Sequence, residues 1–130
     1  MLKVAVDTLR LEVSSFGIRT LMVEPGFFRT EFLNANNTVF IEPEIDDYKP
    51  LTGQLYGQFK GAHRNQTGDP EKGVARIIEV VKGEGFAAGK VFPPSLALGP
   101  DAVEAIRKSC DETLKLLEEW EPLSSDTNLE

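Results

Sequence analysis

The sequence predicts an α/β fold whose sheet is incomplete. Segments with helical spacing alternate with short apolar strands, in the order helix, strand, long loop, helix, short strand and helix. The first predicted strand, residues 18–24, has a continuously apolar centre at residues 21–23, which is typical of a strand buried on both faces of a parallel sheet. Only two strands are predicted, too few for a covered sheet. We therefore expect the chain to be part of a larger α/β unit.

The first helix is predicted at the beginning of the chain and ends before Gly17, a residue type that terminates helices. Its apolar residues recur at helical spacing: Leu2, Ala5, Val6, Leu9 and Val13. No capping residue precedes this helix, which begins abruptly. We therefore expect Met1 to be an interior position of a longer polypeptide.

The middle of the chain carries a long segment without clear periodicity. Residues 27–33 are compatible with a short helical turn, and residues 34–68 are rich in Asn, Gly and Pro with scattered aromatic residues. These features predict an irregular excursion or lid over residues 34–68.

The second half contains two more helices and one strand. Asp69 as N-cap and Pro70 at the first helical position predict a helix start. Residues 95–98 form a possible strand, and Asp101 with Glu104 resembles a capping box at the start of the last helix. The apolar stripe of that helix comprises Val103, Ile106, Cys110, Leu114, Leu117 and Trp120. We expect Cys110 to be buried, and the tail to be polar.

Composition restricts the function classes. The chain has a formal net charge of -7, which argues against nucleic acid and anionic membrane surfaces as partners. No apolar run approaches the length needed to cross a bilayer. No signal peptide is evident and one cysteine cannot form an internal disulfide, so we expect a cytoplasmic protein. His63 has no further ligand residues at suitable spacing, which predicts no metal site.

Several motifs in this order resemble the C-terminal half of the classical short-chain dehydrogenases/reductases. They are residues 7–13 (DTLRLEV), 16–19 (FGIR), 23–30 (VEPGFFRT), 68–72 (GDPEK) and 98–103 (LGPDAV). Apart from the loop, the resemblance covers nearly the whole chain. It implies the C-terminal part of a Rossmann-like, doubly wound parallel sheet over residues 1–123, with a substrate loop at 34–68 and a polar tail at 124–130.

The same resemblance implies a cofactor site. The family motif Pro-Gly-x-x-x-Thr matches Pro25, Gly26 and Thr30, which would approach the nicotinamide of NADP or NAD. A glycine permits close backbone approach, and a hydroxyl can form a hydrogen bond with the carboxamide. Phe27 and Phe28 resemble substrate-pocket positions. The alternatives are a plain strand-to-helix turn and ordinary packing of the aromatic rings.

The family's catalytic tyrosine and lysine have no counterparts in this chain, nor does its glycine-rich phosphate turn. The resemblance places that lysine before Met1, so Lys3 is not the catalytic residue. Tyr56 and Lys60 reproduce the spacing of the pair, but three glycines in residues 53–61 weaken any helix there. We therefore interpret this spacing as a coincidence and assign no catalytic residue.

The resemblance implies that a complete parent interconverts carbonyl and alcohol groups of a small molecule with NAD(P)(H). Without a proton donor and a phosphate turn, the chain alone is expected to be inactive. The sequence identifies neither the substrate nor the choice between NAD and NADP. A homo-oligomer is compatible with the sequence. The alternative is a non-catalytic interaction module that docks through its first and last helices.

Overall fold

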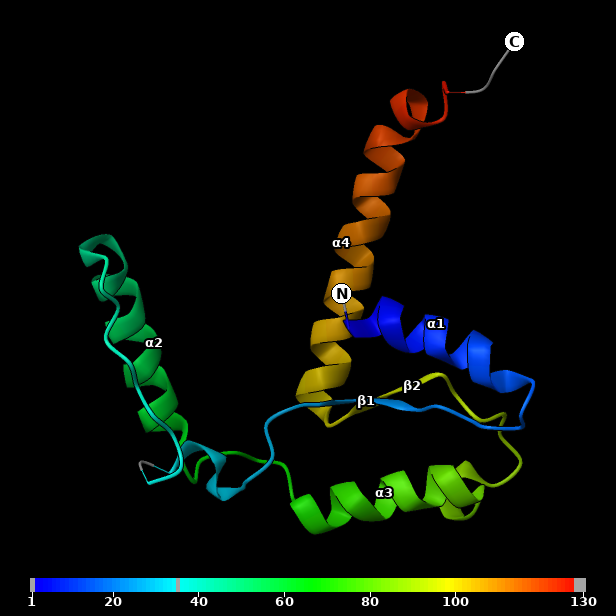
Figure 1. The fold of residues 1–130 in the computed structure, drawn as a ribbon, viewed down its shortest axis with the longest axis horizontal. Coiled ribbons are helices and arrows are strands. Elements are labelled where there is room, and N and C mark those ends of the chain that lie inside the picture. The colour runs from blue at the N-terminus through cyan, green and yellow to red at the C-terminus, as the bar shows by residue number, and fades with distance from the viewer. Residues whose placement is uncertain (1, 35, 128–130) are drawn as a thin grey trace. The chain divides into compact units, whose positions relative to one another are not determined.

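The computed structural model describes residues 2–34 and 36–127, which form two compact units (Figure 1). Unit 1 contains the described residues of 1–26 and 94–130, and unit 2 contains the described residues of 27–93. Residues 128–130 of the predicted tail lie outside the described residues.

Unit 1 is built on a pair of parallel strands, β1 (Met22–Pro25) and β2 (Ser95–Leu98). The register pairs Met22 with Ser95 and Pro25 with Leu98. The two strands are far apart in sequence. Because they run parallel, their carboxyl ends lie at the same edge of the pair. The predicted α/β class and the predicted strand at residues 95–98 are thus confirmed, whereas β1 is shorter than expected.

Two helices accompany these strands in unit 1, α1 (Leu2–Ser14) and α4 (Pro100–Ser124). Ala102 in the first turn of α4 is buried and this end contacts β2, whereas the remainder of α4 runs away from the strands (Figure 1). The expected capping box is wrong. The N-cap is Gly99, whose φ of 110° disfavours other residues, and Asp101 therefore lies inside the helix.

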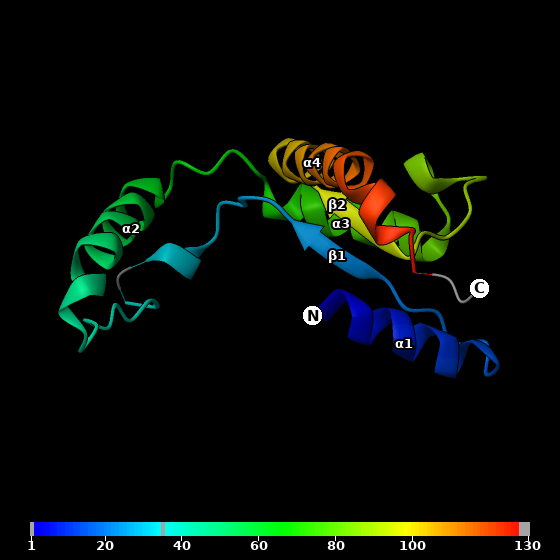
Figure 2. The same cartoon turned by 90° about the horizontal axis from the view of Figure 1, so that it is seen from above.

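Unit 2 contains the helices α2 (Lys49–Ala62) and α3 (Pro70–Lys82), which lie apart in both views (Figures 1 and 2). Its three short 3-10 helices are η1 (Glu31–Leu33), η2 (Asp46–Tyr48) and η3 (Gly85–Ala87). The start of α3 is as predicted, because the Asp69 carboxylate accepts hydrogen bonds from the backbone N–H groups of Glu71 and Lys72.

The helix α2 contradicts the prediction of an irregular segment over the whole of residues 34–68. Tyr56 and Lys60 lie on its face toward an extended segment of the chain. The ring centroids of Phe40 and Tyr56 are 4.8 Å apart, the Tyr56 hydroxyl donates to the carbonyl of Ile41 at 2.9 Å, and the Lys60 ammonium lies 5.0 Å from the Phe40 centroid. These tertiary contacts offset the low helix propensity of the glycines.

The core is small in the part of the chain that the structure describes. Only Leu33 and Ala102 are buried apolar residues, and Gln66 is the buried polar one. Cys110 is exposed, which contradicts the expected burial, because the apolar stripe of α4 is not covered by other described residues. Within the described residues, no helix combines the length and the apolar character needed to cross a membrane.

Candidate functional site

The predicted cofactor residues begin at the carboxyl edge of the strand pair in unit 1. Pro25 ends β1, and the backbone N–H of Gly26 donates to the carbonyl of Leu98 at 2.8 Å. Gly99 follows β2 at the same edge. In open α/β sheets, ligands bind outside the carboxyl ends of parallel strands. The structure therefore places Pro25 and Gly26 where such a sheet forms its ligand crevice.

A carboxylate that the sequence did not indicate lies between the two edge glycines. A Cβ atom built on Gly26 would overlap the carboxylate of Asp101, and one built on Gly99 would lie 2.7 Å from its Oδ1 atom. A side chain at position 26 would thus force the Asp101 carboxylate to move, independently of any ligand. Asp101 belongs to the α4 segment, so only the fold brings it to β1.

The predicted substrate residues Phe27 and Phe28 are the first two residues of unit 2. The backbone N–H of Gly68 donates to the Phe27 carbonyl at 3.1 Å, and that of Arg29 donates to the Gly68 carbonyl at 2.8 Å. These bonds form a parallel bridge between Phe28 and Gly68. They hold the two ends of the intervening excursion together.

The two phenylalanines have different surroundings. The Phe28 ring packs on the first turn of α3, where a Cβ on Gly73 would be 2.7 Å from its Cε1 atom. The Phe27 side chain remains 63% exposed. Phe28 is therefore a packing residue at the start of α3. The preceding residue, Phe27, exposes its aromatic ring to solvent.

The excursion is also tied at its base by the Arg29 side chain, which binds the backbone of a buried residue. Arg29 Nε donates to the backbone carbonyl of Gln66 at 3.0 Å, and Gln66 is only 6% exposed. The Gln66 Oε1 atom has no hydrogen-bond partner among the described residues. The burial of Gln66 was not predicted, because a lone glutamine in a polar segment gives no sequence signal of burial.

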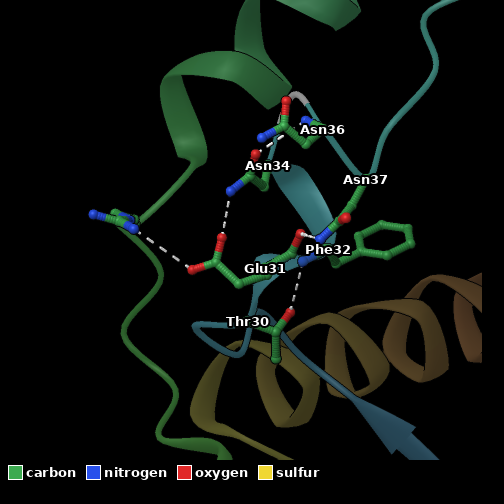
Figure 3. A network of polar contacts seen from close by, with 7 residues as sticks. Thr30, Glu31, Phe32, Asn34, Asn36 and Asn37 are labelled. Atoms are coloured by element: carbon green, nitrogen blue, oxygen red, sulfur yellow. Dashed lines mark hydrogen bonds and ion pairs between the residues drawn. The ribbon is translucent and has the colours of Figure 1, made fainter.

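Thr30 lies at the start of a polar network in unit 2 (Figure 3). Its Oγ1 atom accepts a hydrogen bond from the backbone N–H of Phe32 at 3.3 Å and caps η1. The residue is exposed and has an extended backbone. Because the hydroxyl acts only as an acceptor in this contact, its proton is available for a further acceptor.

The neighbouring Glu31 joins both sides of the same network (Figure 3). Its carboxylate accepts a hydrogen bond from Asn34 Nδ2 at 2.5 Å and forms an ion pair with Arg64 at 3.7 Å. Asn37 Nδ2 donates to the Glu31 backbone carbonyl at 2.9 Å. The residues after Thr30 are thus fixed by side chains from two separate parts of the loop.

The hydrogen bond from the Asn34 amide is the main reason that the pKa of the Glu31 carboxyl lies below 4.5. Desolvation is the next largest effect and opposes this shift, while the Arg64 guanidinium and His63 lower the pKa further. The contribution of this network to stability is present above the unfolded pKa and is lost as the pH falls through the folded pKa.

Asn34→Ala should raise the pKa of Glu31 toward 4.5, because it removes the largest stabilising contact of the charged form. Carboxyl-carbon NMR titration of Glu31 measures this shift. Asn37→Ala is the matched control, since Asn37 contacts only the Glu31 backbone and should leave the pKa unchanged. An equal shift in both variants would show a general loosening of the loop.

A metal site and a catalytic pair of Tyr56 and Lys60 have little support in the described part of the chain. No group of three or more His, Cys, Asp or Glu side chains there could hold a metal ion. Tyr56 and Lys60 do share a helix, but their polar ends contact Ile41 and Phe40. Their contacts hold the extended segment on α2.

The parallel strand pair, its glycine-bordered carboxyl edge and the similarities to known proteins identify the chain as a partial short-chain dehydrogenase/reductase. It is 31% identical over 116 residues to oxidoreductase BOA17 of Botryotinia fuckeliana (strain B05.10), covering 89% of this chain and 39% of that protein. The crystal structure of a short-chain dehydrogenase from Streptomyces avermitilis matches with a TM-score of 0.70 and 32% identity, over 98% of this chain and 43% of that one. No family model matches. The chain thus spans about two fifths of these relatives.

Proposed function

We propose that the chain supplies the nicotinamide side and the substrate side of an oxidoreductase that uses NAD(P)(H) to interconvert carbonyl and alcohol groups of a small molecule. The observation that carries this proposal is the position of Pro25 and Gly26 at the carboxyl end of a parallel strand, with Thr30 four residues further on. The similarity to an oxidoreductase and to a short-chain dehydrogenase supports the reaction class.

The donor chemistry of these residues fits a nicotinamide carboxamide. The Thr30 hydroxyl keeps a proton to donate to the carboxamide oxygen while it accepts from Phe32. The Asp101 carboxylate occupies the space on the side-chain side of Gly26, so a nicotinamide ring would approach the Gly26 backbone from its other side. The nicotinamide supplies the hydride when it is bound, and these residues fix the ring orientation.

On the substrate side, Phe27 is the candidate contact and Phe28 the support behind it. The exposed ring of Phe27 provides apolar surface, which small-molecule pockets use to exclude water. The packing of Phe28 on Gly73 fixes the neighbouring backbone. Residues 34–68 then act as the substrate loop, and the hydrogen bond from Arg29 to Gln66 holds the base of this excursion together.

The chain alone is proposed to be inactive. In this reaction class a positioned proton donor stabilises the charge that develops on the carbonyl oxygen, and a phosphate-binding turn provides much of the cofactor affinity. We assign both to the remaining three fifths of a parent, which also sets the preference for NAD or NADP.

We propose a cytoplasmic location.

A chimera tests the cofactor assignment. In it, this chain replaces the matching part of the Streptomyces avermitilis dehydrogenase. Thr30→Ala should raise the KM for the cofactor about tenfold, because one hydrogen bond of about 1–1.5 kcal/mol is lost. Thr30→Ser, which keeps the hydroxyl, should restore the KM. Initial rates at varied cofactor concentration measure both.

The same threonine also caps η1, so a structural effect needs to be separated from a binding effect. Thermal unfolding of the three proteins provides this separation. A lower Tm for Thr30→Ala with unchanged KM would assign Thr30 to the loop structure alone and contradict the proposed contact.

A further inference from the structure

The Asp101 carboxylate packs between the two residues that follow the strands of unit 1. A Cβ atom built on Gly26 would have Oδ1, Cγ and Oδ2 of Asp101 as its nearest atoms, so the whole carboxylate lies on the side-chain side of this glycine. A Cβ atom built on Gly99 would lie 2.7 Å from Oδ1 and 3.8 Å from the Gly26 Cα atom. One carboxylate therefore contacts the chain at the carboxyl end of both β1 and β2.

The start of α4 holds Asp101 in place. Asp101 lies in the first turn of this helix, directly after Pro100, whose ring is preorganised for a helix start. The backbone N–H of Val103 donates to the Gly99 carbonyl at 3.1 Å, and Ala102 is buried in unit 1. The partial positive charge of a helix N-terminus also favours a carboxylate there. The backbone that carries the Asp101 side chain is thus fixed by the helix itself and by its contact with β2.

These contacts give Gly26 a defined position. Its backbone N–H donates to the Leu98 carbonyl at 2.8 Å, and its Cα atom packs against the Asp101 carboxylate. Because packed groups transmit a change in volume to their neighbours, loss of the carboxylate would free Gly26 to shift toward the vacated space. The strand edge on the other side of Gly26 would move with it.

We propose that Asp101 is a positioning residue for the nicotinamide ring and acts through the Gly26 backbone. The inference rests on the proposed function, in which the ring approaches Gly26 from the side away from Asp101. The carboxylate supports the backbone from behind, so it sets the position of a ring that it does not touch. A misplacement of about 1 Å at a reacting group can cost a factor of about 10² in rate.

Amide hydrogen exchange in the 130-residue chain, followed by NMR, tests whether Asp101 holds Gly26. Asp101→Ala should raise the exchange rate of the Gly26 N–H about tenfold, because the hydrogen bond to Leu98 loses the support of the carboxylate. Asp101→Asn should keep the exchange rate near the wild-type value, since asparagine has the same shape and retains an acceptor oxygen.

Glu104→Ala is the matched control. Glu104 is exposed and lies three residues further along α4, so its replacement removes the same charge from the same helix. It is not among the groups nearest to Gly26, and the Gly26 N–H should exchange as in the wild type. Unchanged Gly26 exchange in Asp101→Ala would overturn the proposal. An equal rise in both variants would indicate a general loosening of α4 and would overturn it as well.

Cofactor kinetics in the chimera with the Streptomyces avermitilis dehydrogenase test the consequence for the nicotinamide. Asp101→Ala should raise the KM for the cofactor about tenfold and leave the KM for the carbonyl substrate unchanged. Asp101→Asn should restore the cofactor KM, and Glu104→Ala should change neither KM. A loss of folded protein would lower the maximal rate without changing the KM values, so this readout separates positioning from stability.

The two experiments distinguish failure of this inference from failure of the proposed function. An active chimera in which Asp101→Ala leaves the cofactor KM unchanged would overturn the positioning role and leave the proposed function intact. A folded chimera without turnover would contradict the proposed function and, with it, the nicotinamide part of the inference. Exchange at Gly26 in the 130-residue chain would still show whether Asp101 supports the strand edge.

Discussion

Gly26→Ala should lower the free energy of unfolding of the chain by about 1–3 kcal/mol, the usual cost of forcing an extra methyl into an occupied site. The added Cβ would overlap the carboxylate of Asp101, which already lies against Gly99. Relief requires a shift of Asp101 or of the carboxyl edge of the strands. Urea unfolding followed by far-UV circular dichroism measures the loss.

A double-mutant cycle identifies the cause of this loss. In an Asp101→Ala background the overlapping carboxylate is gone, so Gly26→Ala should cost much less there. Gly57→Ala is the matched control. A Cβ at this α2 position meets no atom within 4 Å, and alanine should stabilise the helix by about 0.5–1 kcal/mol. Equal costs of Gly26→Ala in both backgrounds would rule out the Asp101 contact as their source.

The elements with strong local signals were predicted from the sequence. The Asp69-Pro70 start of α3 is a local pattern, and the cap forms as expected. The apolar run at residues 21–23 and the segment at 95–98 gave the two strands of the parallel pair. Local propensity and tertiary structure agree at these positions.

The helix α2 could not be predicted in this way because its glycines lower the intrinsic propensity. The contacts that favour it come from Phe40 and Ile41, which precede the helix and return along it. Such contacts depend on the path of the chain between the two segments. Helical propensity alone does not contain that information.

In the candidate site, too, the local features could be predicted from the sequence and the tertiary contacts could not. Pro25, Gly26 and Thr30 followed from one short motif, and the structure gives each a definite position. The role of Asp101 did not follow, because its contact with Gly26 joins segments at opposite ends of the chain. The capping-box pattern with Glu104 instead indicated a local function that the cap at Gly99 excludes.

The second large effect concerns activity. The 130-residue chain alone should oxidise neither NADH nor NADPH in the presence of carbonyl substrates. General acid catalysis typically contributes a factor of about 10²–10⁴ to the rate, and we assign the proton donor to the remainder of a parent. We propose that the residues at the strand edge orient a nicotinamide ring.

The chimera with the Streptomyces avermitilis dehydrogenase supplies, from a relative of the same fold, the groups that we assign to the remainder of a parent. Circular dichroism establishes whether the chimera is folded before its activity is interpreted. The Gly26→Ala chimera is a suitable comparison, because the added Cβ should shift Asp101 or the strand edge while the donated groups remain intact.

The most direct measurement is the rate of NADH or NADPH oxidation, followed at 340 nm with a panel of small carbonyl compounds, for the isolated chain and the chimera in parallel. We predict turnover by the chimera and none above buffer by the chain alone. Turnover by the isolated chain, or a folded chimera without turnover, would contradict the assignment of this chain to the nicotinamide and substrate side of an oxidoreductase.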